Sequence, residues 1–180
     1  MRQKTCKICK TKYIPDRPMQ VCCSIPCAIE YGRNKKSYME RKDIQIRKRE
    51  LLTISELANL AQSAVNKYVR LRDANLPCVS CGRPASWNGQ WHASHYRSRG
   101  GCSHLRFNLL NLHRACSICN NHLSGNIEGY RRGLIERIGH DKLEMLEVAP
   151  KSRKFSREYL ERIRSIFSKR ARALEKKKPQ

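Results

Sequence analysis

The stretches Cys78-Val-Ser-Cys81 and Cys116-Ser-Ile-Cys119-Asn120 decide the fold of this chain. Each holds two cysteines at Cys-x-x-Cys spacing, and the turn between such cysteines aims both sulfurs at one point. Two such pairs supply the four thiolates of a closed tetrahedral zinc site. The sequence therefore predicts a structural zinc ion, without an open coordination position, that holds together the chain between the two pairs.

A second group of cysteines lies near the N-terminus, in Cys6-Lys-Ile-Cys9 and Cys22-Cys23-Ser24-Ile25-Pro26-Cys27. No apolar leader precedes them, so we expect the chain in the reducing cytoplasm, where two sets of four cysteines favour zinc over disulfides. The predicted ligands are Cys6, Cys9, Cys23 and Cys27, in a zinc finger too small to fold without metal. Spacing alone permits Cys22 as well, whereas similarity to small fingers that end in Cys-Ser-x-x-Cys favours Cys23.

The chain is strongly basic, with 38 Lys and Arg against 15 Asp and Glu in 180 residues and a formal net charge of +23. Such an excess predicts a polyanionic partner, of which nucleic acid is the leading candidate. A basic ribosomal or membrane-surface protein would carry a similar charge but would need no catalytic residues. No apolar run of about 18 residues occurs, so no membrane-spanning segment is predicted.

Changes in composition divide the chain into four parts. They are predicted to be an N-terminal zinc finger, a basic helical linker, a metal-containing domain with a preceding helix, and a helical basic tail: residues 1–31, 32–52, 53–139 and 140–180. The linker can be a solvated helix or a disordered segment that folds on a phosphate backbone. In the third part, Thr53-Ile-Ser-Glu56 fits a capping box before an apolar stripe at helical spacing. The helix should end near Asn75, because Pro77 disfavours helical geometry in the residue before it.

The central segment resembles the His-Asn-His nuclease superfamily, whose unit is a β-hairpin and a helix around one catalytic metal ion. In that pattern a His on the first strand is the general base. An Asn shortly before the second cysteine pair steadies the hairpin, and a His or Asn directly after the last Cys binds the metal. His95, Asn111 and Asn120 occupy these places, and an Asn after the final Cys is similar to phage endonuclease VII. The resemblance implies an α+β fold: a zinc-stapled ββα-metal core flanked by helices.

A larger part of the chain resembles the lambdoid phage NinG family of recombination endonucleases, also called Rap. The shared stretches include Leu105-Arg-Phe-Asn108, Ser124-Gly-Asn126 and Arg137-Ile-Gly139. This resemblance implies cleavage of branched DNA, such as Holliday junctions and D-loops, during phage recombination in the host cytoplasm. Where an acidic residue is expected in this family, the chain has His92. An imidazole ligates Mn²⁺ readily and suits Mg²⁺ poorly, so the catalytic ion, Mg²⁺ or Mn²⁺, stays open.

The chemistry of these residues supports the same interpretation. A neutral imidazole can deprotonate water near neutral pH, so we expect His95 to be the general base. A divalent ion held by Asn120 and His92 would stabilise the charge that develops on a phosphodiester. Three basic side chains are expected to clamp flanking phosphates: Arg97, Arg99 and Arg106.

Two alternative functions use the same residues. In a non-catalytic zinc-containing DNA-binding protein, His95 would only hydrogen-bond a carbonyl group. In a sequence-specific nicking endonuclease, the site would be the same but the substrate would be linear DNA. The roles of His113 and His122 stay open between metal or substrate contact and simple packing. Because two strands of a junction must be cut, a homodimer is one expected form.

Overall fold

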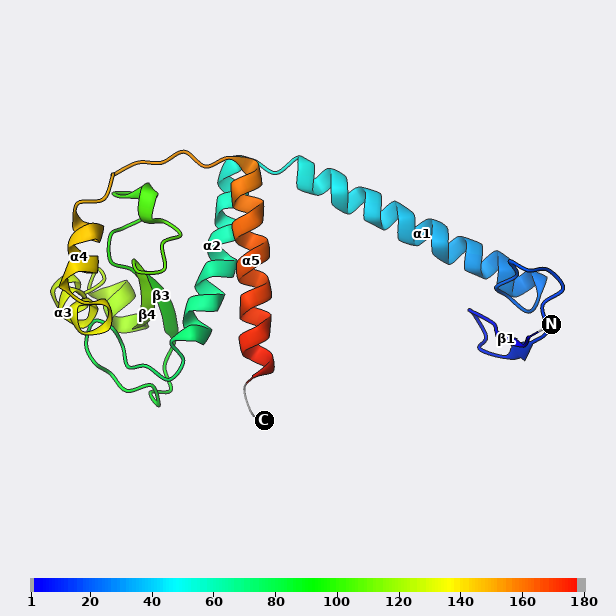
Figure 1. The fold of residues 1–180 in the computed structure, drawn as a ribbon, viewed down its shortest axis with the longest axis horizontal. Coiled ribbons are helices and arrows are strands. Elements are labelled where there is room, and N and C mark those ends of the chain that lie inside the picture. Colours follow the sequence, from blue (N-terminus) through cyan, green and yellow to red (C-terminus); the bar gives the residue numbers. More distant parts are fainter. Residues whose placement is uncertain (1, 178–180) are drawn as a thin grey trace. The chain divides into compact units, whose positions relative to one another are not determined.

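The structure is a computed structural model that describes residues 2–177. The chain divides into two compact units, and the boundary between them falls between Leu52 and Thr53. Helices and two small two-stranded sheets make the protein α+β, as predicted (Figure 1). Among the described residues, no helix is long and apolar enough to cross a membrane.

The N-terminal unit consists of a small hairpin and one long helix. Strands β1 (Lys4–Thr5) and β2 (Lys12–Tyr13) pair antiparallel. Helix α1 (Ile25–Glu50) begins after Ser24, whose side chain accepts a hydrogen bond from the N–H of Cys27. A serine in this position satisfies one of the N–H groups that the first helical turn leaves without a partner.

Helix α1 contains the whole basic stretch from Arg33 to Glu50, so this segment is helical in the structure. The helix buries none of its residues, and its last turn is basic, which suits the negative end of a helix dipole. Cys27, the last predicted ligand of the finger, already belongs to its first turn. The last predicted ligand of the finger and the basic stretch therefore belong to the same helix.

The C-terminal unit contains a pair of helices, α2 (Ile54–Arg72) and α5 (Arg157–Lys176), that pack side by side (Figure 1). The predicted capping box begins α2: Thr53 accepts from the N–H of Glu56, whose carboxylate accepts from the N–H of Thr53. The rings of Tyr68 and Phe167 meet between the helices, with centroids 5.2 Å apart. The amphipathic C-terminal helix thus packs on the first helix of this unit.

A hairpin lies between the paired helices and the rest of the unit (Figure 1). Strands β3 (Trp91–His95) and β4 (Leu112–Cys116) pair antiparallel, with His95 opposite Leu112. The connection between them contains the short 3₁₀ turn η1 (Ser103–Leu105), and one π-helical turn, η2 (Ile118–His122), follows β4. Every residue of β4 is buried, so this strand forms the centre of the unit.

Helices α3 (Ile127–Ile138) and α4 (His140–Glu147) cover the side of the hairpin away from α2 (Figure 1). Tyr130 ties α3 to both strands: its hydroxyl donates to the carbonyl of Ser94 at 2.8 Å and accepts from the N–H of His113 at 3.1 Å. The side chain of Tyr130 is fully buried. A buried hydroxyl that both donates and accepts fixes the position of α3 on the hairpin.

Two glycines let α3 approach the first cysteine pair closely. A Cβ atom at Gly129 would lie 2.1 Å from the carbonyl oxygen of Ser80, and one at Gly133 would lie 1.9 Å from that of Val79. Real Cβ atoms do not come so near to backbone oxygens, so only glycine fits at these two places. The backbone around Cys78 and Cys81 therefore rests directly on the helix.

Helix α2 ends at Arg72, a little before the predicted end near Asn75, because the next residue turns inward. The carboxylate of Asp73, only 2% exposed, accepts from Nε of Arg72 at 2.6 Å and from the backbone N–H of Arg114 at 3.0 Å. Arg137 of α3 lies 3.7 Å from the same carboxylate. Asp73 thus joins α2 and α3 through the charged side chains of Arg72 and Arg137, and β4 through the backbone N–H of Arg114.

Candidate functional site

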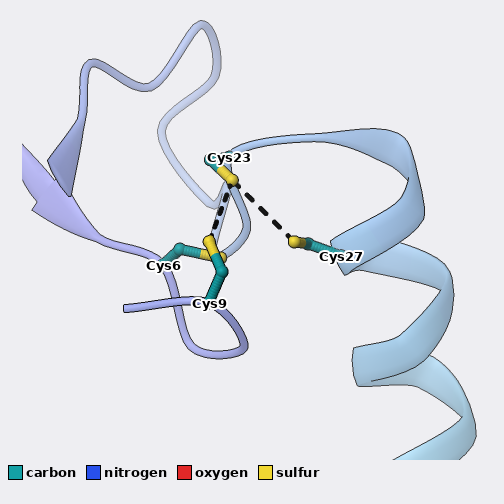
Figure 2. A group of neighbouring side chains, drawn as sticks. All are labelled: Cys6, Cys9, Cys23 and Cys27. Atoms are coloured by element: carbon teal, nitrogen blue, oxygen red, sulfur yellow. Dashed lines mark hydrogen bonds between the residues drawn. The ribbon is translucent and has the colours of Figure 1, made fainter. Parts of the chain in front are cut away.

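The four N-terminal cysteines predicted as zinc ligands come together where α1 begins (Figure 2). Their Sγ atoms all lie within 4.8 Å of one another. Cys9 Sγ is 3.5 Å from Cys23 Sγ, which is 3.9 Å from Cys27 Sγ. The group includes Cys23 and not Cys22. Four thiols at these separations can hold one zinc ion.

Backbone groups prepare Cys6 to act as a metal ligand. Burial raises the pKa of its thiol, but N–H groups of Cys23, Ile8 and Cys9 act in the opposite direction and bring the pKa down to about 6. Hydrogen bonds to a charged group stabilise its charged form, here the thiolate that binds zinc. The backbone around Cys6 thus favours the thiolate, which is the form of cysteine that binds zinc.

The second set of cysteines meets between the hairpin and α3. The Sγ atoms of Cys78, Cys81, Cys116 and Cys119 also lie within 4.8 Å of one another. The N–H of Cys116 donates to Cys78 Sγ at 3.3 Å, and that of Cys119 donates to Cys116 Sγ at 3.5 Å. This set can also hold zinc. Its position fastens the loop after α2 to the end of β4.

Next to this zinc set lies a polar pocket of about 350 Å³. Four predicted site residues line it: His92, His95, Arg99 and Asn120. They come from β3, from the loop after it and from η2. The antiparallel pairing of β3 with β4 places His92 opposite Ala115, close to the turn that follows β4 and contains Asn120, and His95 opposite Leu112 at the other end of that strand.

His95 is held as a neutral imidazole. Its Nε2 lies 3.0 Å from the carbonyl oxygen of Arg106, and because a carbonyl can only accept, Nε2 carries the proton and Nδ1 keeps its lone pair. Burial is the main cause that lowers the pKa of His95 to about 4, and the nearby charges of Arg99 and Arg106 lower it further. The side chain is therefore unprotonated at neutral pH and has a lone pair on Nδ1.

His92 and Asn120 have the donor atoms for a divalent ion. In the described part of the chain, Nε2 of His92 is buried without a hydrogen-bond partner. Nδ2 of Asn120 donates to Asn121 Oδ1 at 2.7 Å, which leaves the amide oxygen of Asn120 free to bind. A buried polar atom without a partner is costly unless something binds it. One imidazole nitrogen and one amide oxygen, with water and phosphate, fit an ion such as Mn²⁺.

Asn111 lies behind the pocket, within the hairpin connection. Its amide oxygen accepts from the N–H of Arg97 at 2.8 Å, and its Nδ2 donates to the carbonyl of Arg97 at 3.0 Å and to that of Leu105 at 3.2 Å. Asn111 is fully buried. Its side chain thus holds the two ends of the loop that contains Arg99 and does not line the pocket.

Two of the three predicted phosphate clamps point elsewhere in the structure. Nη1 of Arg97 donates to the carbonyl of Glu147 at 2.8 Å. The guanidinium of Arg106 donates to Gln62 Oε1 at 3.3 Å and to Asn59 Oδ1 at 3.0 Å, so it is engaged with α2. Arg99 is exposed at the rim of the pocket.

The histidines with open roles fall outside the pocket lining. His113 is 6% exposed, and its Nε2 lies 3.1 Å from the carbonyl oxygen of Leu110. Burial and the charge of Arg72 lower the pKa of His113 to about 4, although Asp73 acts in the opposite direction. His122 is exposed at the end of η2.

The pocket also contains a residue that the sequence did not single out, Asn66 of α2. It lies next to the apolar stripe of this helix, and no motif connects it to the cysteines or histidines. Only the packing of α2 on β3 brings it to the site. Sequence spacing cannot reveal such a residue.

Fold and site together define a small α+β protein with two tetra-cysteine clusters and a pocket of histidine and asparagine side chains. The family described as Bacteriophage Lambda NinG protein matches residues 1–177. The chain belongs to the NinG family, which confirms the resemblance to that family found in the sequence.

Named relatives agree with this assignment. The chain is 33% identical over 190 residues to protein ninG of Escherichia phage 933W, covering 96% of this chain and 94% of the relative. Protein ninG of Escherichia phage lambda is 38% identical over 131 residues, which is 73% of this chain but only 63% of the relative. Protein ninG of Salmonella phage P22 is 39% identical over 131 residues, 73% of this chain and 64% of the relative. No solved structure matches the chain.

Proposed function

We propose that this protein is a metal-dependent, structure-selective DNA endonuclease that acts on branched recombination intermediates, such as Holliday junctions and D-loops, in phage recombination. The observation that carries the proposal is the meeting of His95, His92 and Asn120 in one pocket with Arg99 at its rim. A phosphodiester hydrolase needs these groups: a neutral base, ligands for a divalent ion and a cation for the phosphate.

The surrounding fold supports a ββα-metal centre of the His-Asn-His type. Strands β3 and β4 supply the hairpin, His95 ends the first strand, and Asn120 follows the last cysteine directly. Asn111 has the hydrogen bonds of a brace for the hairpin connection. In this arrangement the zinc set has a structural role, and the chemistry takes place in the adjacent pocket.

In the proposed mechanism, Nδ1 of His95 accepts the proton of the attacking water. The carbonyl of Arg106 orients the ring by accepting from Nε2–H, and the low pKa keeps the ring unprotonated at neutral pH. Arg99 holds the negatively charged phosphate near the water. A divalent ion bound by His92 and Asn120 would stabilise negative charge on a non-bridging oxygen and on the leaving oxygen.

DNA is the proposed partner because a net charge of +23 favours a polyanion. The C-terminal unit has an exposed set of basic side chains on α5: Arg162, Arg164, Lys169, Arg170 and Arg172. Phosphate contacts of this kind release counterions, so binding should weaken steeply as salt rises. A homodimer, acting in the host cytoplasm, would let two copies cut two strands of one junction.

The proposal is tested by incubating the protein with a four-way DNA junction and either Mn²⁺ or Mg²⁺. The wild type should cut, and His95→Ala should cut about 10²- to 10⁴-fold more slowly, as expected for loss of a general base. His140→Ala is the matched control, since His140 is exposed and lies outside the pocket. A junction left intact with every divalent ion, or equal rates for wild type and His95→Ala, would contradict the proposal.

The same assay separates the alternative functions. Linear duplexes of varied sequence are included, and the branched substrate should be preferred over all of them. Preference for one linear sequence would favour a sequence-specific nicking endonuclease. Tight junction binding without any cleavage would favour a non-catalytic zinc-containing DNA-binding protein.

His92 should set the choice of catalytic ion. An imidazole suits Mn²⁺ better than Mg²⁺, whereas a carboxylate suits Mg²⁺. We therefore expect the wild type to be more active with Mn²⁺, and His92→Asp to shift the ratio of rates towards Mg²⁺. An unchanged ratio of Mn²⁺ to Mg²⁺ activity in His92→Asp would mean that position 92 does not bind the ion.

A further inference from the structure

Asn66 lies on α2 and lines the same pocket as His92, His95 and Asn120. It is half-buried, and the structure uses only one end of its amide. Its Oδ1 accepts from Nε2 of Gln62 at 2.8 Å. Among the described residues, its Nδ2 has no hydrogen-bond partner.

A chain of hydrogen bonds fixes which end of this amide is free. Arg106 can only donate, and its Nε donates to Oε1 of Gln62 at 3.3 Å. Gln62 is 3% exposed, and once its oxygen is used by Arg106, its Nε2 is the atom that faces Asn66. The amide oxygen of Asn66 must accept from that group, so its two N–H donors are left for the pocket.

We infer that Asn66 is a substrate-contacting residue, whose Nδ2 donates a hydrogen bond to a non-bridging oxygen of the phosphodiester in the pocket. The inference rests on the proposed function, since it concerns the same site. A neutral amide suits this contact because it offers donors only at its free end, and a hydrogen bond to a charged oxygen is stronger than one between neutral groups. Asn66 thus complements Arg99, which adds charge from the exposed rim of the same pocket.

The same chain of hydrogen bonds connects the substrate contact with the candidate base. The side chain of Arg106 orients Gln62, and therefore Asn66, while its own carbonyl accepts from His95. The guanidinium of Arg106 also donates to Oδ1 of Asn59, which precedes Gln62 on α2. Arg106 is consequently a positioning residue that sets a phosphate donor and a proton acceptor relative to each other, which is a different role from direct phosphate contact.

The inference is tested with Asn66→Asp, Asn66→Ala and Asn66→Ser, with Ser63→Ala as the control on the exposed face of α2. An aspartate has the same shape and still accepts from Gln62, but it presents an oxygen instead of donors to the phosphate. Cleavage of a four-way junction by Asn66→Ala should lose about 10- to 100-fold in kcat/KM, the effect of one hydrogen bond to a charged group. Asn66→Asp should lose more, whereas Asn66→Ser, which can still donate, should lose less.

A purely structural role predicts a different order. Asn66→Asp would then behave like wild type, because its contact with Gln62 is kept, and Asn66→Ala would lower the unfolding temperature. Wild-type kcat/KM in both Asn66→Asp and Asn66→Ala would overturn the inference. If one variant does not fold, the order of the other two still decides: serine above alanine, alanine above aspartate, or serine above aspartate.

A binding measurement keeps the inference separate from the proposed function. Fluorescence anisotropy of a labelled junction is measured without added Mg²⁺ or Mn²⁺ and without a chelator, so that cleavage is not supported while zinc stays bound to the cysteine sets. We expect Asn66→Asp to raise Kd about tenfold or more relative to Ser63→Ala. If the wild type binds but never cuts, and Asn66→Asp binds more weakly, the nuclease proposal fails while the phosphate contact stands. Equal Kd values for wild type and Asn66→Asp would overturn the contact.

Discussion

The two cysteine sets have the same ligands but very different surroundings. In the N-terminal set, Cys6 is buried while Cys9 is exposed and Cys23 and Cys27 are half-buried. In the described part of that unit, the only buried residues are Cys6, Pro15 and Cys22. In the second set Cys81 is exposed, but the other three cysteines belong to an apolar cluster that also contains large side chains of α3 and α4: Tyr130, Leu134, Leu143 and Leu146.

This difference indicates what zinc does in each unit. A segment with almost no apolar core depends on metal binding for its folding free energy, which is about 10–16 kcal/mol in small zinc fingers. In the C-terminal unit, a bound metal would add to the burial of apolar surface and to the contacts of Asp73. The N-terminal unit should therefore need zinc in order to fold, whereas in the C-terminal unit zinc should be one of several stabilising interactions.

The largest expected effect is the loss of one zinc ligand from each set. Cys9→Ser and Cys81→Ser are a matched pair, since each replaces the exposed second cysteine of its Cys-x-x-Cys pair. Both variants should bind one zinc ion fewer per chain. Cys9→Ser should remove hydrogen-exchange protection throughout residues 4–23, whereas Cys81→Ser should expose the hairpin but leave α2 and α5 protected through their mutual packing.

The contrast would break if Cys81→Ser also abolished protection in α2 and α5. The C-terminal unit would then depend on its metal as completely as the N-terminal unit. Zinc content by mass spectrometry under native conditions is the control that each variant has lost only its own ion.

A second prediction concerns the buried carboxylate that only the C-terminal unit has. Asp73→Ala would leave Arg72 and Arg137 without their carboxylate partner, and removing one partner of a buried ion pair costs about 3–5 kcal/mol. Urea unfolding followed by the fluorescence of Trp87 and Trp91 reports this unit, because both tryptophans of the chain lie in it. Asp43→Ala, at an exposed position of α1, should leave the same midpoint unchanged.

Glycine substitutions should have opposite signs in the two units. In α3, Gly133→Ala places a Cβ against the carbonyl of Val79 and should destabilise the C-terminal unit by about 1–3 kcal/mol. In α1, nothing lies within 4 Å of a Cβ at Gly32, so Gly32→Ala should stabilise the helix by about 0.5–1 kcal/mol. Urea unfolding measures the first and the thermal loss of helical circular dichroism the second. If Gly133→Ala also stabilised the protein, α3 would not rest on the backbone around Cys78 and Cys81.

Local patterns of the sequence predicted much of this molecule. The capping box at Thr53 and the convergence of both cysteine sets follow from short-range spacing, the α+β class is what the family resemblance implied, and the structure confirms all three. The nuclease site itself stays a prediction. The sequence did not reveal the contributions that depend on tertiary packing, such as the free amide of Asn66 or the engagement of Arg106 with α2. These contacts join residues that are distant in the chain and follow no periodic pattern.

The last and smallest effect concerns pH, because all six histidines lie in the C-terminal unit. Burial lowers the pKa of His95 from 6.5 to about 4 in the folded protein. Between pH 6.5 and 4, His95 is therefore protonated in the unfolded chain but not in the folded chain. Its contribution to the free energy of unfolding is present above pH 6.5 and is lost as the pH falls towards 4. Between pH 7 and 5.5 the loss is about 1 kcal/mol.

Urea unfolding of wild type and His95→Gln at pH 7 and 5.5 measures this contribution. Thiolate protonation affects both proteins alike, so the difference between their pH dependences isolates His95. The wild type should lose about 1 kcal/mol more than the variant, and junction cleavage, corrected for folded protein, should not fall with a midpoint near 6.5. An acid limb centred at 6.5, with identical pH dependences of stability, would mean that His95 is solvated. The side chain of His95 would then be exposed to solvent, like most side chains of the N-terminal unit. The two units would differ only in the surroundings of their cysteine sets.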